Sequence, residues 1–141
     1  GPLGGSRAGR HLDFEPRVAE GRWLALGGWA TAMIDLTDGL ATDLGHLVRA
    51  SRVGAIVDAY AVPVADAAKD AEAAWTDGED FELLFTAPAE RGGTLGRAWR
   101  RRFGTSLHLI GSMTAGRPVI RVSGANGLVT LRSRGYEHFR T

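Results

Sequence analysis

Residues 30–40, Ala-Thr-Ala-Met-Ile-Asp-Leu-Thr-Asp-Gly-Leu, carry the pattern that decides the fold. The run at 30–36 is short and apolar, which predicts a buried strand. Residues 37–39 are typical of a tight turn, and leucines recur at helical spacing from there to about Arg52. A strand, a turn and an amphipathic helix in direct succession indicate a domain in which helices pack on a sheet.

The same interleaving of short apolar runs and helical patterns continues on both sides of this segment. Further strands are predicted at 54–60, 81–86, 107–110, 119–122 and 128–131, and further helices at 16–26, 63–74 and 90–102. Asn126-Gly127, between the last two strands, is the strongest short-range signal for a β-hairpin. Because helices and strands interleave while the hairpin is antiparallel, the sequence predicts an α+β fold with a mixed β-sheet flanked by helices.

The composition excludes several classes of protein. The 141 residues suffice for one domain with a hydrophobic core, and the absence of cysteine excludes a disulfide scaffold and a thiolate metal site. Seventeen basic against sixteen acidic residues leave a net charge of +1, which argues against a nucleic-acid partner. No apolar run approaches the ~20 residues of a membrane helix, and the N-terminus lacks the pattern of a signal peptide. We therefore expect a soluble, cytoplasmic protein without a membrane partner.

The turn after the first quoted strand is a candidate metal site. Asp35 would end the strand and Asp38 would begin the following helix, at the sheet edge where α/β proteins tend to bind ligands. Two carboxylates at this spacing could both reach one Mg²⁺ bound to a polyphosphate, and Thr37 adds a hydroxyl group. An acid or a threonine before a helix is also the ordinary N-cap, so both interpretations stay open.

Two further segments carry groups that suit ligand binding. Residues 77–85 place three acids around a turn, where Glu79 could accept hydrogen bonds from an amine; a solvated acidic turn is the alternative. Near the C-terminus, Tyr136 beside a glycine could stack on a flat ligand, or could pack into the core instead. None of the four histidines fits a metal-ligand spacing, and His46 is expected either on a helix surface or in a packing role. The triple arginine at 100–102 is expected to be a solvated helix end.

Taken together, these segments resemble the C-terminal domain of thiamine-monophosphate kinase, a family related to aminoimidazole ribonucleotide synthetase and selenophosphate synthetase. The acidic stretch Gly-Glu-Asp-Phe-Glu-Leu-Leu-Phe and the closing Gly-Tyr-Glu-His-Phe make the match specific. Thr37 stands where the family has serine, and Phe81 where it has tyrosine. The matching segments occur in family order at 16–21, 32–40, 43–44, 54–55, 78–86, 110–111 and 135–139.

The resemblance implies a fold of α/β/α layers and the transfer of the ATP γ-phosphate to thiamine monophosphate. It implies that Asp35 and Asp38 help to hold Mg²⁺ on the ATP phosphates and that Thr37 contacts those phosphates. Glu79 and Tyr136 would bind the substrate. No general base is assigned, because the attacking phosphate oxygen is already anionic.

The resemblance also implies a division of the chain. Residues 1–15 would be a glycine-rich interdomain segment or arm, and residues 16–141 a C-terminal domain that binds substrate and nucleotide phosphates. The family's N-terminal ATP-binding and dimerisation domain is absent, so we expect this chain alone to be inactive and a homodimer to form only in a full-length protein. Two alternatives stay open: another ATP-dependent synthetase of the same superfamily, or a non-catalytic module for ligand binding or interaction.

Overall fold

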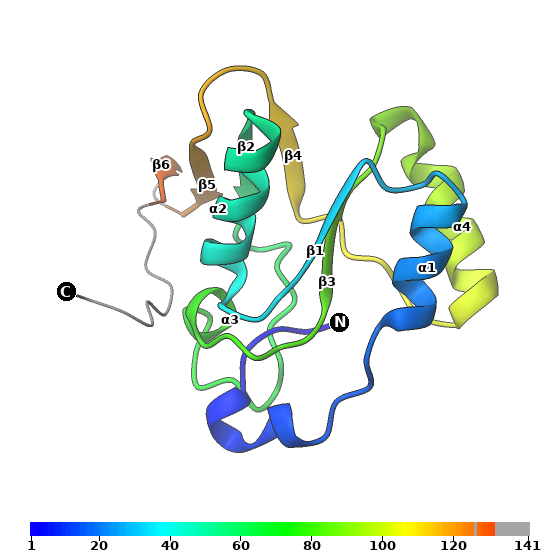
Figure 1. Ribbon diagram of the computed structural model, residues 1–141. Helices are drawn as coiled ribbons and strands as arrows, with labels where there is room; N and C mark the ends of the chain where they lie inside the picture. Colours follow the sequence, from blue (N-terminus) through cyan, green and yellow to red (C-terminus); the bar gives the residue numbers. More distant parts are fainter. Residues whose placement is uncertain (126, 132–141) are drawn as a thin grey trace.

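The computed structural model describes residues 1–125 and 127–131, and it has the α+β architecture that the sequence predicts (Figure 1). The helices are α1 (Val18–Leu26), α2 (Leu40–Ser51), α3 (Ala73–Thr76) and α4 (Gly92–Phe103). Short 3₁₀ turns are η1 (Ser6–Ala8), η2 (Arg10–Leu12) and η3 (Ala89–Arg91). The strands are β1 (Ala32–Asp35), β2 (Gly54–Asp58), β3 (Leu83–Thr86), β4 (Gly111–Thr114), β5 (Ile120–Gly124) and β6 (Gly127–Thr130).

The described strands form two sheets. A mixed four-stranded sheet has the order β4-β2-β5-β6, in which β2 and β5 are parallel and the other two pairs are antiparallel. The predicted hairpin is confirmed as the β5–β6 pair. The second sheet is the antiparallel pair β1–β3, which aligns Asp35 with Leu83. Strand pairing over such sequence distances is set by packing, which a local pattern does not encode.

The β1–β3 pair lies between two groups of helices, which gives the layered arrangement (Figure 1). On one side, Leu84 of β3 packs on the main core, where α2 meets the four-stranded sheet. On the other side, Phe85 packs on an aromatic cluster between α1 and α4 that contains Trp23 and Trp99. Adjacent residues on a strand point to opposite faces, so β3 belongs to both cores.

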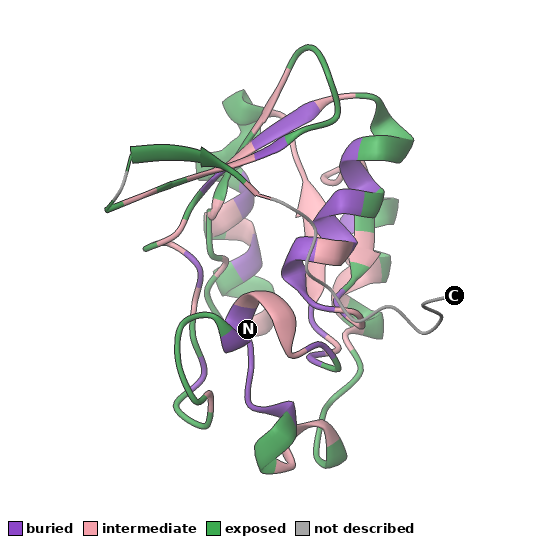
Figure 2. Cartoon of the chain, turned by 90° about the vertical axis from the view of Figure 1, so that its left-hand side faces the viewer, coloured by how far each residue is buried: buried purple, intermediate pink, exposed green. Residues whose placement is uncertain are grey.

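The prediction of an alanine-rich helix at 63–74 is wrong, because α3 is confined to Ala73–Thr76. The Leu3 N–H donates to the Pro63 carbonyl at 2.7 Å, and the Ala65 N–H donates to the Leu3 carbonyl at 2.9 Å. This β-bridge, which pairs Leu3 with Val64, ties residues 63–65 to the N-terminal segment and removes them from the expected helix. Figure 2 shows that the N-terminal segment engaged in this contact is itself buried.

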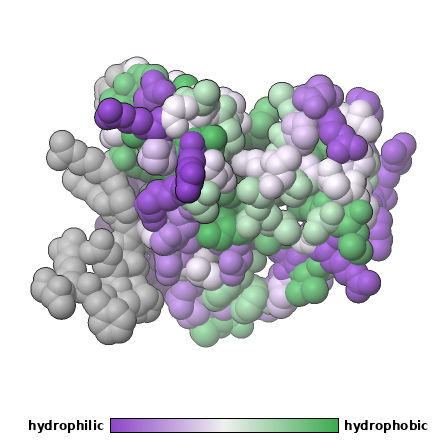
Figure 3. Space-filling model, turned by 45° about the horizontal axis from the view of Figure 1, so that its top comes forward, coloured by the Kyte–Doolittle hydropathy of each residue, from purple (hydrophilic) through white to green (hydrophobic). Residues whose placement is uncertain are grey.

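The prediction of a strand at 107–110 is also wrong, because β4 begins at Gly111. Gly111 approaches the backbone of Ile56 so closely that a Cβ atom would collide with it. The sheet therefore selects the glycine for pairing, whereas the pattern favours the apolar residues before it. The arginines at 100–102 are exposed at the end of α4, as predicted, and hydrophilic side chains gather on that outer side in Figure 3. Among the described residues, no helix has the length and apolar character that crossing a membrane requires.

Candidate functional site

The two acidic segments that the sequence singles out lie side by side. The β1–β3 pairing continues past the ends of both strands, since the Phe81 N–H donates to the Leu36 carbonyl at 2.8 Å. One residue further along, the Glu79 N–H donates to the Thr37 carbonyl, also at 2.8 Å. Residues about forty positions apart therefore form one surface at the end of this sheet.

Two glycines allow this close approach. Gly39 has φ 96°, and a Cβ atom there would lie 2.9 Å from the Trp75 carbonyl oxygen. Gly78 has φ 70°, and a Cβ atom there would lie 2.7 Å from the Thr37 carbonyl oxygen. A side chain at either position would be strained by the backbone and by a steric clash, so glycine is required at both.

Asp43 holds the turn between β1 and α2. Its buried Oδ2 accepts hydrogen bonds from the backbone N–H groups of Thr37, at 2.9 Å, and Asp38, at 3.0 Å. Burial raises the pKa of Asp43, and these two hydrogen bonds oppose the rise. Asp43 belongs to the segments that resemble the family, but its position in the sequence does not by itself predict this role. The available signal was an acid in the first turn of a helix that follows a tight turn.

Among the described residues, one group of three side chains could hold a metal ion, because a ligand atom of each lies within 4.8 Å of the others: Asp38, Asp43 and His46. His46 is exposed on α2, and its Nδ1 accepts a hydrogen bond from Arg49 at 3.1 Å. Asp35 is exposed at the end of β1 and is not part of this group. Its role as a metal ligand stays a prediction, as do those of Asp38 and Thr37.

The chemistry of these donors suits Mg²⁺ in part. Mg²⁺ prefers oxygen ligands and usually takes one or two carboxylates together with waters and phosphate oxygens. Asp35 and Asp38 can supply those carboxylates, because neither forms an ion pair with the described arginines or lysine. The carboxylate of Asp43 already accepts two hydrogen bonds from the backbone. The imidazole of His46 suits Mg²⁺ less well than an oxygen ligand does.

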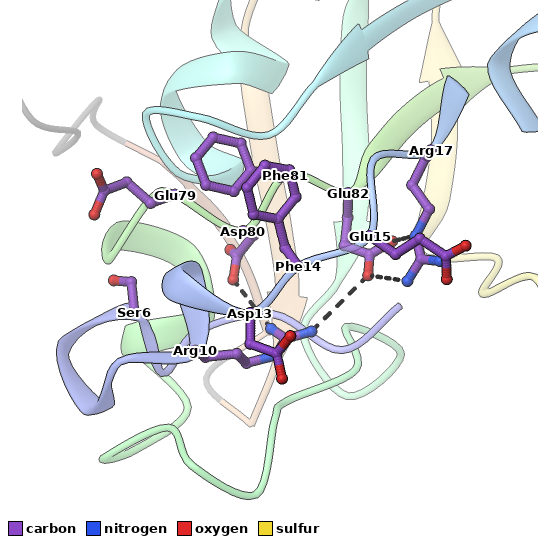
Figure 4. Close-up of a pocket in the computed structure, with 10 residues that line it drawn as sticks. All are labelled: Ser6, Arg10, Asp13, Phe14, Glu15, Arg17, Glu79, Asp80, Phe81 and Glu82. Atoms are coloured by element: carbon purple, nitrogen blue, oxygen red, sulfur yellow. Dashed lines mark hydrogen bonds and ion pairs between the residues drawn. The ribbon is translucent and has the colours of Figure 1, made fainter. Parts of the chain in front are cut away.

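The second acidic segment carries four carboxylates: Glu79 is exposed, Asp77 is half-buried and paired with Arg7, and Asp80 and Glu82 are buried. Figure 4 shows the last two beside Glu79. Glu79 is exposed, and its carboxylate points away from the two arginines in the view. Asp80 and Glu82 are buried and point toward Arg10 and Arg17. Alternation along a strand places Glu82 and Leu84 on one face, but it does not predict the arginines that approach the two buried acids from the N-terminal segment.

The buried acids differ in how well their charges are compensated. Arg17 donates two hydrogen bonds to Glu82, at 3.1 and 3.0 Å. Burial acts to raise the pKa of Glu82, but the charged donors around it, Arg17 first among them, together lower it. For Asp80, Oδ1 accepts the Gly4 N–H at 2.7 Å and lies 3.4 Å from Arg10. Its Oδ2 is buried without a hydrogen-bond partner among the described residues. Burial therefore prevails and raises the pKa of Asp80 to about 6.

These residues line a cavity of about 50 Å³. One wall is a stacked pair of rings, Phe14 and Phe81, whose centroids are 4.2 Å apart. Phe81 thus packs against an apolar ring, and this contact does not require a phenol hydroxyl group. Glu79 borders the same cavity. Tyr136, the other residue expected to bind substrate, lies outside the described residues.

Three comparisons with known proteins bear on this site. Residues 5–123 match the family model "AIR synthase related protein, C-terminal domain". Thiamine-monophosphate kinase of Salmonella typhimurium is 41% identical over 139 residues, which cover 94% of this chain and 42% of that protein. The crystal structure of thiamine-monophosphate kinase from Stenotrophomonas maltophilia K279a matches with a TM-score of 0.67 at 35% identity, covering 77% of this chain and 35% of that one.

A further similar structure is AaThiL complexed with AMPPCP and TMP, with a TM-score of 0.69 at 25% identity. The match covers 99% of this chain and 49% of that chain. The chain spans less than half the length of each of these relatives.

Proposed function

The chain belongs to the family of AIR synthase related proteins through their C-terminal domain, and on that premise we propose that it is the C-terminal part of a thiamine-monophosphate kinase. That enzyme transfers the ATP γ-phosphate to thiamine monophosphate and forms thiamine diphosphate. The observation that carries the proposal is the direct backbone contact between the turn bearing Asp38 and the segment bearing Glu79. It brings Asp38, which we propose to act at the phosphates, and Glu79, which we propose to bind the substrate, onto one surface. A cytoplasmic location belongs to the same proposal, because ATP is an intracellular phosphate donor.

In this proposal the turn after β1 faces the ATP phosphates. Asp35 and Asp38 help to hold Mg²⁺, which when bound would neutralise the charge of the phosphates. The Thr37 hydroxyl donates to a phosphate oxygen, and Asp43 fixes the backbone of Thr37 and Asp38 through its two hydrogen bonds. Because Asp43 acts from the core, the turn is already ordered before a ligand arrives.

The segment 78–82 faces the acceptor substrate in the same proposal. Glu79 is exposed and accepts hydrogen bonds from the amino group of the aminopyrimidine, while Tyr136 packs on a substrate ring. The acceptor phosphate oxygen is already anionic, so phosphoryl transfer requires positioning and charge neutralisation rather than a general base. The structural relative AaThiL, which was complexed with AMPPCP and TMP, supports this pair of substrates.

This chain would supply one wall of the site. The relatives are more than twice as long as the segment that they share with it. An N-terminal domain would supply further metal ligands, most of the nucleotide contacts and the homodimer interface. We therefore expect no appreciable kinase turnover by the isolated chain; turnover at a rate near that of a two-domain kinase would contradict this expectation.

Calorimetric titration of the chain with thiamine monophosphate tests the proposed substrate. We expect binding that Glu79→Gln weakens about tenfold, the order of one lost hydrogen bond to a charged acceptor. Glu72→Gln, which changes an exposed acid outside the site, should leave the affinity unchanged. Binding of aminoimidazole ribonucleotide in preference to thiamine monophosphate would favour another member of the superfamily instead.

A further inference from the structure

Asp80 lies between two residues with an unusual backbone. Glu79 and Phe81 both have φ 53°, in the left-handed region that L-residues other than glycine rarely adopt. Such a conformation persists only where the surrounding structure holds it, and here two examples flank a single residue. Something must therefore hold residues 79–81 in this turn.

The backbone contacts hold the outer residues of the turn, and the Asp80 side chain holds its centre. The N–H groups of Glu79 and Phe81 are bonded to the strand end that precedes α2. In the opposite direction, the Asp80 carboxylate reaches the N-terminal segment, where it accepts the Gly4 N–H at 2.7 Å and faces Arg10 at 3.4 Å. Its side chain is 1% exposed, so these contacts are made inside the protein.

The charge of Asp80 has an energetic cost that argues against a purely stabilising role. One of its oxygens is buried and unpartnered among the described residues, and burial raises its pKa. The nearest cation to Asp80 is Arg10, while two neighbouring acids, Asp77 and Glu82, add negative charge. Each of those acids has its own arginine partner: Arg7 for Asp77 and Arg17 for Glu82. A buried acid so incompletely compensated is better explained by the geometry that it enforces.

We propose that Asp80 is a positioning residue for Glu79. Its carboxylate, tied to Gly4 and Arg10, holds the strained turn so that the Glu79 carboxylate points outward while Phe81 stacks on Phe14 (Figure 4). The link to the substrate rests on the proposed function. The anchoring itself concerns this chain alone and is tested separately.

Amide hydrogen exchange tests the anchoring. In Asp80→Ala we expect the Gly4, Glu79 and Phe81 amides to exchange at least tenfold faster, while amides within the β1–β3 pair exchange as in the wild type. Asp77→Ala is the matched control, because it removes a neighbouring carboxylate that is paired with Arg7, and it should leave these three amides unchanged. If the alanine variant does not fold, Asp80→Asn, which keeps an acceptor for Gly4, should still raise exchange at Glu79 about threefold. Wild-type exchange at Glu79 and Phe81 in the folded variant overturns the proposal.

A double-mutant cycle on the affinity for thiamine monophosphate tests whether Asp80 acts through Glu79. We expect Asp80→Ala to weaken binding about tenfold in the wild type and less than twofold in the Glu79→Ala background. Equal effects in both backgrounds overturn the positioning role, because a merely structural residue would act independently of Glu79. If the wild-type chain binds no thiamine monophosphate, the proposed substrate is wrong, and the exchange experiment still decides whether Asp80 anchors the turn.

Discussion

At the scale of single residues, buried carboxylates organise this site more than the exposed ones do. Asp43 orders the turn that bears Thr37 and Asp38, and Asp80 lies at the centre of the turn that bears Glu79. Both buried acids have a raised pKa, with burial as the main cause in each case. The groups proposed to meet ligands are thus carried on backbone that is fixed from inside the protein.

Asp43→Ala should lower the free energy of unfolding by about 2–4 kcal/mol, because it leaves two half-buried backbone N–H groups, those of Thr37 and Asp38, without their acceptor. Asp43→Asn should cost less than about 1 kcal/mol, since the amide oxygen can occupy the place of Oδ2 and the buried charge is removed. Urea unfolding at neutral pH measures both. A similar loss in the two variants would show that the charge, rather than the acceptor, is what the turn requires.

Asp80 predicts a specific dependence of stability on pH. Its pKa is raised to about 6 in the folded state, so between its unfolded value and pH 6 the folded protein binds more protons than the unfolded chain. Its contribution to stability is therefore fully present at low pH and is lost as the pH rises through about 6. Between pH 7.5 and pH 5, the wild type should gain about 1 kcal/mol relative to Asp80→Asn, measured by urea unfolding. Effects of Asp43 and Glu82 are common to both proteins and cancel. A constant difference across this range would contradict the raised pKa.

At the scale of elements, the N-terminal segment is an integral part of the domain. Leu3 is 4% exposed within the main core, and its backbone bridges residues 63–65. The same segment supplies the Gly4 N–H and Arg10 to Asp80. The N-terminal segment therefore links the main core to the candidate site. How Leu3 packs in the core influences where Gly4 and Arg10 meet Asp80.

Leu3→Ala should lower the free energy of unfolding by about 2–4 kcal/mol, as expected for truncating a buried leucine. Leu12→Ala is the matched control, because Leu12 is 80% exposed and the change should stay within about 0.5 kcal/mol. Thermal or urea unfolding measures both variants. Equal small effects would show that the segment is not part of the cooperative unit.

At the scale of the whole molecule, β3 joins two hydrophobic clusters. Leu84 packs on the main core and Phe85 on the aromatic cluster that includes Trp23 and Trp99. The candidate site begins where β1 and β3 end, so both clusters support the same sheet end. Coupling through one strand pair favours unfolding in a single step.

Unfolding monitored by tryptophan fluorescence, which is dominated by the aromatic cluster, should coincide with unfolding monitored by far-ultraviolet circular dichroism. Leu44→Ala, in the main core, should lower the free energy of unfolding by about 2–5 kcal/mol, and by the same amount in both measurements. Curves that separate would show that the two clusters unfold independently.

Local periodicity and turn chemistry suffice to predict the α+β class, the strand, turn and helix around residues 32–51 and the closing hairpin. The sequence also points to both acidic segments. Three features depend on packing instead: the contact between those segments, the buried hydrogen bonds of Asp43 and Asp80, and the pairing of residues 63–65 with Leu3. The physical reason is range: hydrogen bonds such as Gly4 to Asp80 join residues distant in the chain, and burial, which raises the pKa of these acids, exists only once the chain has packed.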